Sequence, residues 1–211
     1  MKRTAPLFTA RFLMLMPLIF LVGCITKQSL VSSSPDFHPM SSQESLRDRY
    51  RVGLIMNQSI DAEVARFVAQ QGGLIYDFEF KIGQDIRKTL PIYLNSFMDT
   101  VIIKNFNEGK AFDFVLDPKV TSSLFTYIGE SAAPRYELSI ALDVPVIKDG
   151  VIQERFHVKN NSKVEIAAFS NGDKERTETM RLTYEEQLKV MYNELGNQLK
   201  EFLGSKRPRS K

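Results

Sequence analysis

The feature that most constrains the fold is a long alternation of apolar and polar residues in the second half of the chain. Apolar side chains recur at every second position over residues 136–146 and, except at Glu154, again over residues 152–158. A period of two places such side chains on one face of a β-strand. Asp149-Gly150 stands between the two runs and is a typical sequence for a tight hairpin turn. We therefore predict an antiparallel hairpin with one buried face.

Other segments of the chain also have the pattern of strands. A turn at Asn160-Asn161 would lead into a third strand over residues 164–168, so that the hairpin grows into a three-stranded meander. Shorter apolar or alternating runs predict four earlier strands, at residues 50–57, 74–80, 100–104 and 112–117.

Three segments show the 3.6-residue period of an amphipathic helix. The first covers residues 60–71, with Ser59 as its expected N-cap. The second covers residues 82–98 and contains Pro91, which is expected to kink it. The third and longest covers residues 179–203. Together these elements predict an α+β fold: a mixed, largely antiparallel sheet with a C-terminal meander and two or three helices packed on one face.

Composition limits the kinds of protein that this chain can be. Its 211 residues are 43% hydrophobic, which is enough for one domain with a sizeable core. It has one Cys and two His. A single thiol excludes a disulfide within the chain and a structural zinc site of the usual cysteine-rich kind.

Residues 1–23 have the parts of a secretory signal peptide. A positively charged start without acidic residues is followed by an eleven-residue apolar run over residues 12–22. A membrane-spanning helix needs about 20 apolar residues, so the run fits the hydrophobic region of a signal peptide.

The end of this run resembles the lipobox of bacterial lipoproteins, in the residues Leu21-Val22-Gly23-Cys24. The resemblance implies recognition of Leu21, Val22 and Gly23 by the signal peptidase and cleavage before Cys24. It also implies a diacylglycerol group on the Cys24 thiol and an acyl chain such as palmitate on its new amine, with no other cofactor. The alternative is a plain secretory signal with a chance Cys at its end.

The residue after Cys24 bears on the destination. An Asp there would resemble the inner-membrane retention signal of enteric bacteria, but the chain has Ile25. We therefore expect a lipid-anchored protein of the bacterial outer membrane, on its periplasmic side.

The predicted organisation has four parts. Residues 1–23 are the signal peptide, and residues 24–48 are the lipidated Cys and a Ser/Pro-rich flexible tether. A coil of that length spans roughly 25–30 Å. Residues 49–204 form a single α+β domain, and residues 205–211 form a basic, disordered tail.

Charge argues against a nucleic-acid partner. The signal peptide carries three of the 28 basic residues and no acidic residue, so the mature chain has 25 of each sign. The tail is locally basic and is either simply solvated or in contact with an anionic group; its cations are Lys206, Arg207, Arg209 and Lys211.

Catalytic patterns are missing from the sequence. It has no G-x-S-x-G, H-E-x-x-H or G-x-x-x-x-G-K-[ST] motif. His157 falls on the polar face of a predicted strand, and the carboxylate pairs at 77/79 and 113/117 have the spacing of solvent-facing strand residues. We expect a protein that is not an enzyme and holds no metal.

The layout of the mature chain resembles the small envelope lipoproteins of the YajG-like and LptE-like groups. The resemblance depends on the order of the lipobox, the Ser-rich tether, a strand, a helix, another strand, the meander and the terminal helix. The segments that carry it include Arg51-Val52-Gly53-Leu54, Ile82-Gly83-Gln84-Asp85-Ile86 and Phe112-Asp113-Phe114-Val115-Leu116. It implies a compact α+β domain and a non-enzymatic accessory of a larger assembly.

Two functions follow from these expectations. The first is a structural or assembly component of an envelope complex for secretion, export or motility, with contacts through a sheet edge or apolar patch and with self-association left open. The alternative is a binding module for lipid, lipopolysaccharide or peptidoglycan, which would need a concave site.

Overall fold

The computed structural model describes residues 25–30, 46–47, 49–71, 74–128, 135–165 and 173–206. Its two α-helices are α1 (Ile82–Asn95) and α2 (Asp173–Ser205), and two short 3-10 helices are η1 (Gln58–Ala62) and η2 (Glu108–Ala111). The strands are β1 (Ile25–Leu30), β2 (Arg51–Ile55), β3 (Ala65–Gln71), β4 (Leu74–Phe80), β5 (Asp99–Ile103), β6 (Phe114–Leu116), β7 (Lys119–Ile128), β8 (Arg135–Lys148) and β9 (Val151–Glu165).

The larger sheet has six strands and is mixed. Along it the order is β5-β2-β6-β8-β7, and β9 pairs with the other edge of β8. The β2–β5 and β2–β6 pairs are parallel, whereas β8 is antiparallel to β6, β7 and β9. Because β6 and β7 pair with successive parts of β8 on either side of Pro118, they act as one interrupted strand. The predicted mixed, largely antiparallel sheet is confirmed.

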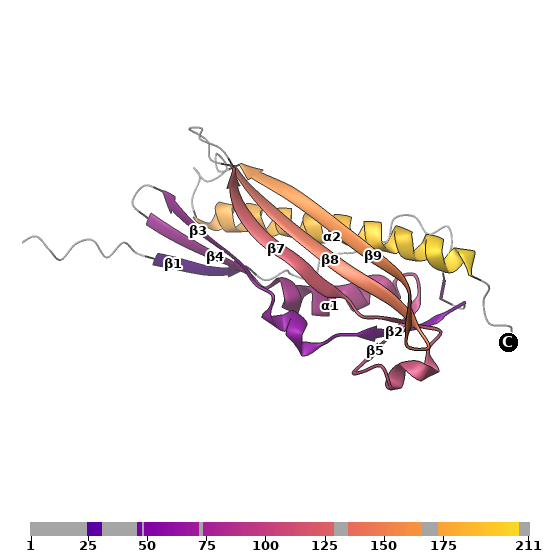
Figure 1. Ribbon diagram of the computed structural model, residues 1–211. Helices are drawn as coiled ribbons and strands as arrows, with labels where there is room; N and C mark the ends of the chain where they lie inside the picture. The colour runs from indigo at the N-terminus through magenta and orange to yellow at the C-terminus, as the bar shows by residue number, and fades with distance from the viewer. Residues whose placement is uncertain are drawn as a thin grey trace, which may run out of the picture.

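The smaller sheet has three strands in the order β1-β4-β3. β3 and β4 form an antiparallel pair, and β1 lies parallel to β4. In Figure 1 this sheet lies at one end of the elongated molecule, and the turn between β8 and β9 lies at the opposite end.

Both α-helices cover one face of the larger sheet and share one core with it. Every second residue of β8 from Leu138 to Val146 is buried in this core. α2 runs along the back of β7, β8 and β9 (Figure 1). The apolar stripe that α2 contributes is buried as the sequence predicts, including Leu188, Met191, Tyr192, Leu195 and Leu199. The predicted α+β class, with helices on one face, is confirmed.

One predicted helix is wrong. Residues 60–71 form the end of η1 and the strand β3, and the cap of η1 is Asn57, whose side chain accepts a hydrogen bond from Ser59 N–H at 3.2 Å. The apolar spacing of this segment fits a helix, but its residues also alternate. The ladder with β4 runs from Ala65 opposite Phe80 to Gln71 opposite Leu74 and decides between the two.

The predicted three-stranded meander is present, but its third strand is not the one predicted. β9 continues through Asn160 and Asn161 to Glu165, because β8 offers hydrogen-bonding partners along its whole length. The side chain of Gln187 on α2 also donates to the carbonyl of Asn160 at 2.7 Å, and this hydrogen bond connects this part of β9 to the helix. The third strand of the meander is β7, whose sequence predicts no element.

The helices differ from expectation in detail. α1 continues through Pro91, which is buried. α2 begins six residues before the predicted start at residue 179. Glu185 on α2 is buried and forms an ion pair with Arg181. Among the described residues, neither helix combines the length and apolar composition that crossing a membrane requires.

The predicted tether contains ordered structure at both ends. Ile25–Leu30 forms β1 instead of a coil. Leu46 is 1% exposed, and its N–H donates to the carbonyl of Phe97 at 2.8 Å, so the folded part begins before the predicted residue 49. The signal-peptide residues and most of the tether lie outside the described residues.

Candidate functional site

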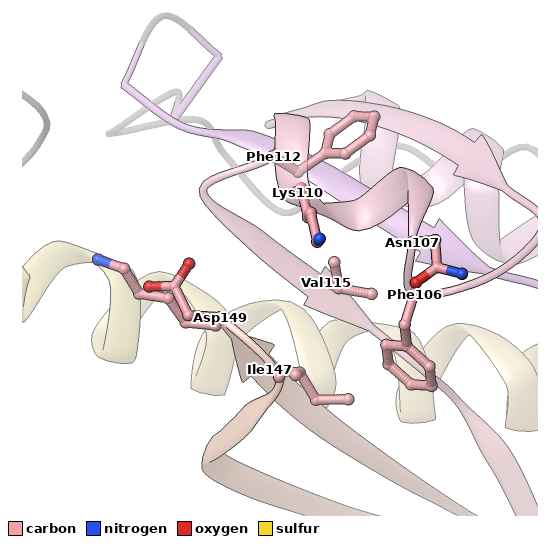
Figure 2. A pocket seen from close by; sticks show the side chains of 9 residues that line it. Phe106, Asn107, Lys110, Phe112, Val115, Ile147 and Asp149 are labelled. Carbon is pink, nitrogen blue, oxygen red and sulfur yellow. The ribbon is translucent and has the colours of Figure 1, made fainter.

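A concavity opens on the face of the larger sheet that the helices leave uncovered. Its volume is about 470 Å³, within the range of small-ligand sites. It lies between the segment that carries η2 and the β8–β9 hairpin (Figure 2). The lining residues are Phe106, Asn107, Lys110, Phe112, Val115, Ile147, Lys148, Asp149 and Gly150.

The apolar floor of the concavity, made by Val115, Ile147 and Phe112, is the exposed side of a small second core. This core comprises Ile55, Ile103, Val115 and Ile147, with Phe112 packed against them. These residues come from β2, β5, β6 and β8 and point away from the helices. The sheet therefore has a buried apolar patch on its second face at this end.

Gly53 makes room for the wall of the concavity. A Cβ at this position in β2 would lie 3.2 Å from the ring of Phe112 and 2.8 Å from Ile103 Cδ1. The ring of Phe112 therefore occupies space that any other residue at position 53 would fill. Strand glycine often marks such a close approach.

Backbone and side-chain hydrogen bonds hold the η2 segment in place. The N–H of Asp113 donates to the carbonyl of Arg51 at 2.8 Å, and the Arg51 N–H donates to the Asp113 carboxylate at 2.9 Å. At the other end of the segment, the side chain of Asn105 accepts from Asn107 N–H at 3.0 Å. The wall of the concavity is therefore fixed to β2 through Asp113, and the Asn105 contact closes a turn within the segment.

The rim of the concavity carries more positive than negative charge. Lys110 and Lys148 both line it and are exposed, with Asp149 as the acidic residue of the lining. The Lys148 ammonium itself lies over the ring of Phe114, 5.6 Å from its centre, and Phe114 belongs to the core shared with the helices. The Arg51 guanidinium lies over the Phe112 ring, 4.9 Å from its centre. The site combines an apolar floor with cations at its edge, which suits a group that is apolar and carries a negative charge.

Apolar side chains remain exposed around the concavity. Phe106 is 48% exposed, and Val151 and Ile152 of the hairpin are 61% and 50% exposed. Ile102 on β5, at the open edge of the described sheet, is 57% exposed. Exposed apolar residues gathered at one end of a domain are typical of an interaction surface.

A buried polar cluster between α1 and α2 serves to hold the helices together. The hydroxyl of Tyr184 donates to the Asp85 carboxylate at 2.9 Å, and the hydroxyls of Thr89 and Tyr192 are 2.9 Å apart. Burial, followed by the charge of Asp85, raises the pKa of Tyr184 well above its usual value. The side chains of all four residues are buried, so the cluster is closed to a ligand.

The residues that the sequence assigns to lipidation lie outside the described part of the chain. These are Leu21, Val22, Gly23 and Cys24, and the tail cations Arg207, Arg209 and Lys211 lie outside it too. Lys206 is described. Its carbonyl accepts from the hydroxyl of Tyr50 at 2.6 Å, and its ammonium lies over the ring of Phe202 at 4.8 Å. These contacts hold the end of α2 close to the start of β2.

Three carboxylates of the two pairs have structural partners. Asp77 is 4% exposed, against expectation, and accepts from Arg66 Nε at 2.8 Å. Asp113 binds the backbone of Arg51, and Asp117 forms an ion pair with Lys119 at 3.4 Å.

His157 is exposed on β9, opposite Asp143, which pairs with Arg155. In the described segments no group of three or more His, Cys, Asp or Glu side chains is arranged to hold a metal ion.

The sequence could not reveal the concavity. Its lining comes from a loop after β5, from β6 and from the β8–β9 hairpin, and only the fold brings these segments together. Of the lining, only the hairpin turn could be predicted from the sequence. Asp149 and Gly150 have φ angles of 51° and 77°, as an Asp-Gly turn between two strands predicts.

Comparison with known proteins shows the fold. No family model matches the chain, and no curated protein matches its sequence. A crystal structure of the Xanthomonas campestris protein XCC0632, assigned to the family DUF330, superposes with a TM-score of 0.53 at 12% identity. The match covers 81% of this chain and 91% of that protein. The chain therefore shares its α+β architecture with a DUF330 protein.

Two further solved structures are less similar. One is the uncharacterized lipoprotein B of Nitrosomonas europaea, with a TM-score of 0.48, 6% identity and coverage of 79% of this chain and 92% of that protein. The other is named as a homologue of a neuraminyllactose-binding hemagglutinin from Helicobacter pylori, with a TM-score of 0.46, 13% identity and coverage of 79% and 96%. At these TM-scores neither adds to the description of the fold, and the resemblance to the YajG-like and LptE-like groups stays a prediction.

Proposed function

We propose that this protein is a lipid-anchored lipoprotein on the periplasmic side of the outer membrane, where it acts as a non-catalytic assembly component of an envelope complex. The anchor is Cys24, which would carry the diacylglycerol and the N-acyl chain. The contact with the complex is made at the end of the domain that holds the concavity. The machine served would be one for secretion, export or motility.

The observation that carries this proposal is the concavity with its surroundings. A buried apolar floor, exposed apolar residues and an open strand edge meet at one end of the domain. The two lysines at the rim favour an acidic partner. The occupant that fits best is a segment of a partner protein with an apolar side chain beside a carboxylate.

Charge reversal at the rim tests the docking part of the proposal. Full-length protein is cross-linked in cells, and mass spectrometry identifies what copurifies. Lys110→Glu combined with Lys148→Glu is expected to abolish recovery of a defined partner complex. The matched control is Lys159→Glu combined with Lys163→Glu, which makes the same charge change at exposed positions of β9. Equal recovery with both variants would contradict docking at the concavity.

The anchoring part has its own test. Cys24→Ser should leave the domain folded but move it from the outer-membrane fraction to the soluble periplasmic fraction. Membrane fractionation after a wash that removes peripheral proteins measures this. Retention of the variant in the washed membrane would count against lipid as the main attachment.

The concavity also favours one alternative function. An apolar floor with lysines in the lining suits an amphiphile with an anionic group, such as a lipid or part of a lipopolysaccharide. Recovery of lipid or glycan in place of a partner protein, lost in the Lys110→Glu and Lys148→Glu variant, would support a binding module.

A further inference from the structure

The strand β1 begins directly after the residue that the lipid anchor would occupy. Ile25, the first residue of β1, is the next residue after Cys24. Consecutive Cα atoms are about 3.8 Å apart. The position of β1 therefore fixes where the anchor can lie relative to the rest of the domain.

β1 is part of the folded domain. It pairs in parallel with β4 along its full length, from Ile25 opposite Ile75 to Leu30 opposite Phe80. It also contacts α2. Ile25 is level with the end of β4 where that strand joins β3, because Gln70 of β3 lies opposite Ile75 as well.

From this register we infer that the lipid anchor is docked against the domain, so that the β3–β4 end of the small sheet lies directly on the membrane surface. The inference rests on the proposed lipidation of Cys24. It replaces the expected flexible spacer between lipid and domain. Residues 31–45 follow the docked strand, so they add no distance between the membrane and the fold.

A docked anchor also determines which end of the domain faces the membrane. The small sheet and the turn between β8 and β9 lie at opposite ends of the domain (Figure 1). The 14 residues of β8 span on the order of 45 Å at about 3.3 Å per residue. The concavity is then held far from the membrane that anchors the protein, in reach of a partner in the periplasm.

Two insertions of the same linker test the docking. A 12-residue Gly/Ser linker adds about 20 Å of flexible reach. It is placed before β1, between Cys24 and Ile25, or after β1, following Ser34. A docked β1 predicts that only the first insertion releases the domain from the membrane. A flexible tether over residues 24–48 predicts the same effect for both.

The readout is quenching of a fluorophore by nitroxide on lipid headgroups. Full-length acylated protein is reconstituted in liposomes, labelled through Val68→Cys on β3 or through Val151→Cys in the hairpin. Both positions are exposed, at 59% and 61%. Strong quenching is expected at position 68 and background quenching at position 151. The insertion before β1 should lower quenching at position 68 to background, and the insertion after β1 should leave it unchanged.

Failure of the inference and failure of lipidation look different. The mass of the mature protein shows whether Cys24 carries its acyl chains. An acylated, liposome-bound protein with weak quenching at position 68, or with equal effects of both insertions, would overturn the docked anchor. A protein without acyl chains that does not bind liposomes would overturn the anchoring proposal, and the docked anchor with it.

Discussion

Gly83 shows how a single residue fixes the position of a helix. A Cβ at this residue would lie 1.4 Å from the carbonyl oxygen of Ile60, and the N–H of Gly83 donates to the carbonyl of Glu63 at 3.0 Å. The first turn of α1 therefore lies directly against the backbone of η1. The atoms in the way belong to the main chain, so a side chain at position 83 cannot be accommodated by a rotamer change.

Gly83→Ala is therefore expected to destabilise the domain strongly. Overpacking against backbone should lower the free energy of unfolding by about 3 kcal/mol. Urea denaturation of the mature chain carrying Cys24→Ser, to avoid acylation, measures the change. Gly204→Ala is the matched control, because no atom lies within 4 Å of its added Cβ. It should be neutral or stabilising by up to about 1 kcal/mol, and equal effects of the two changes would contradict the contact with η1.

The sequence predicts the surroundings of the buried carboxylates only in part. The burial of Asp77 was not predicted, because its partner Arg66 lies in a segment whose spacing also fits a helix. Only the pairing of β3 with β4 places the two side chains together. The pairing of Asp85 with Tyr184 could have been expected from the spacing of polar residues on the two helices. Asp85 and Thr89 share one face of α1, as Tyr184 and Tyr192 share one face of α2.

At the scale of elements, the contact between α1 and α2 depends on buried tyrosines. Tyr93, Tyr184 and Tyr192 are all at most 3% exposed. Burial raises the pKa of Tyr93 to about 12. It also raises the pKa values of Tyr184 and Tyr192, although Thr89 partly opposes the shift at Tyr192. The folded protein thus keeps these hydroxyls protonated at a pH where the unfolded chain ionises them.

Stability should therefore fall in strongly alkaline solution. The contribution of these tyrosines is fully present below their unfolded pKa of about 10 and is lost as pH rises through the folded values. Each tyrosine should lower the free energy of unfolding by up to about 1.4 kcal/mol per pH unit above pH 10. Urea denaturation at pH 9 and pH 11 measures the fall. Tyr192→Phe should make the fall smaller by one tyrosine's share, and an unchanged difference would show that Tyr192 is not shifted.

Element types were predictable wherever one pattern fitted the sequence. The alternation in β8 and the stripe on α2 each allow one interpretation, and the structure confirms both. Residues 60–71 fit two periods, and only the ladder with β4 selects the strand. Asn160-Asn161 has the composition of a turn, but pairing with β8 and the hydrogen bond from Gln187 outweigh that local preference.

At the scale of the whole molecule, the fold class followed from the sequence and the arrangement of its two ends did not. The α+β class depends on local periods, which the sequence contains. The concavity and the docking of β1 depend on pairings between segments far apart in the chain, such as Ile25 with Ile75. The resulting molecule has a small sheet at one end and the concavity, with its apolar floor and lysines in the lining, at the other.

We propose that the protein binds its partner through the end of the domain that holds the concavity. The most direct measurement is photo-cross-linking in cells, with a photoreactive amino acid in place of Phe106 at the concavity or of Leu182 on α2. These two apolar residues are similarly exposed, at 48% and 52%. We expect a defined cross-linked partner from position 106 and none from position 182. The same product from both positions, or a product from position 182 alone, would contradict it.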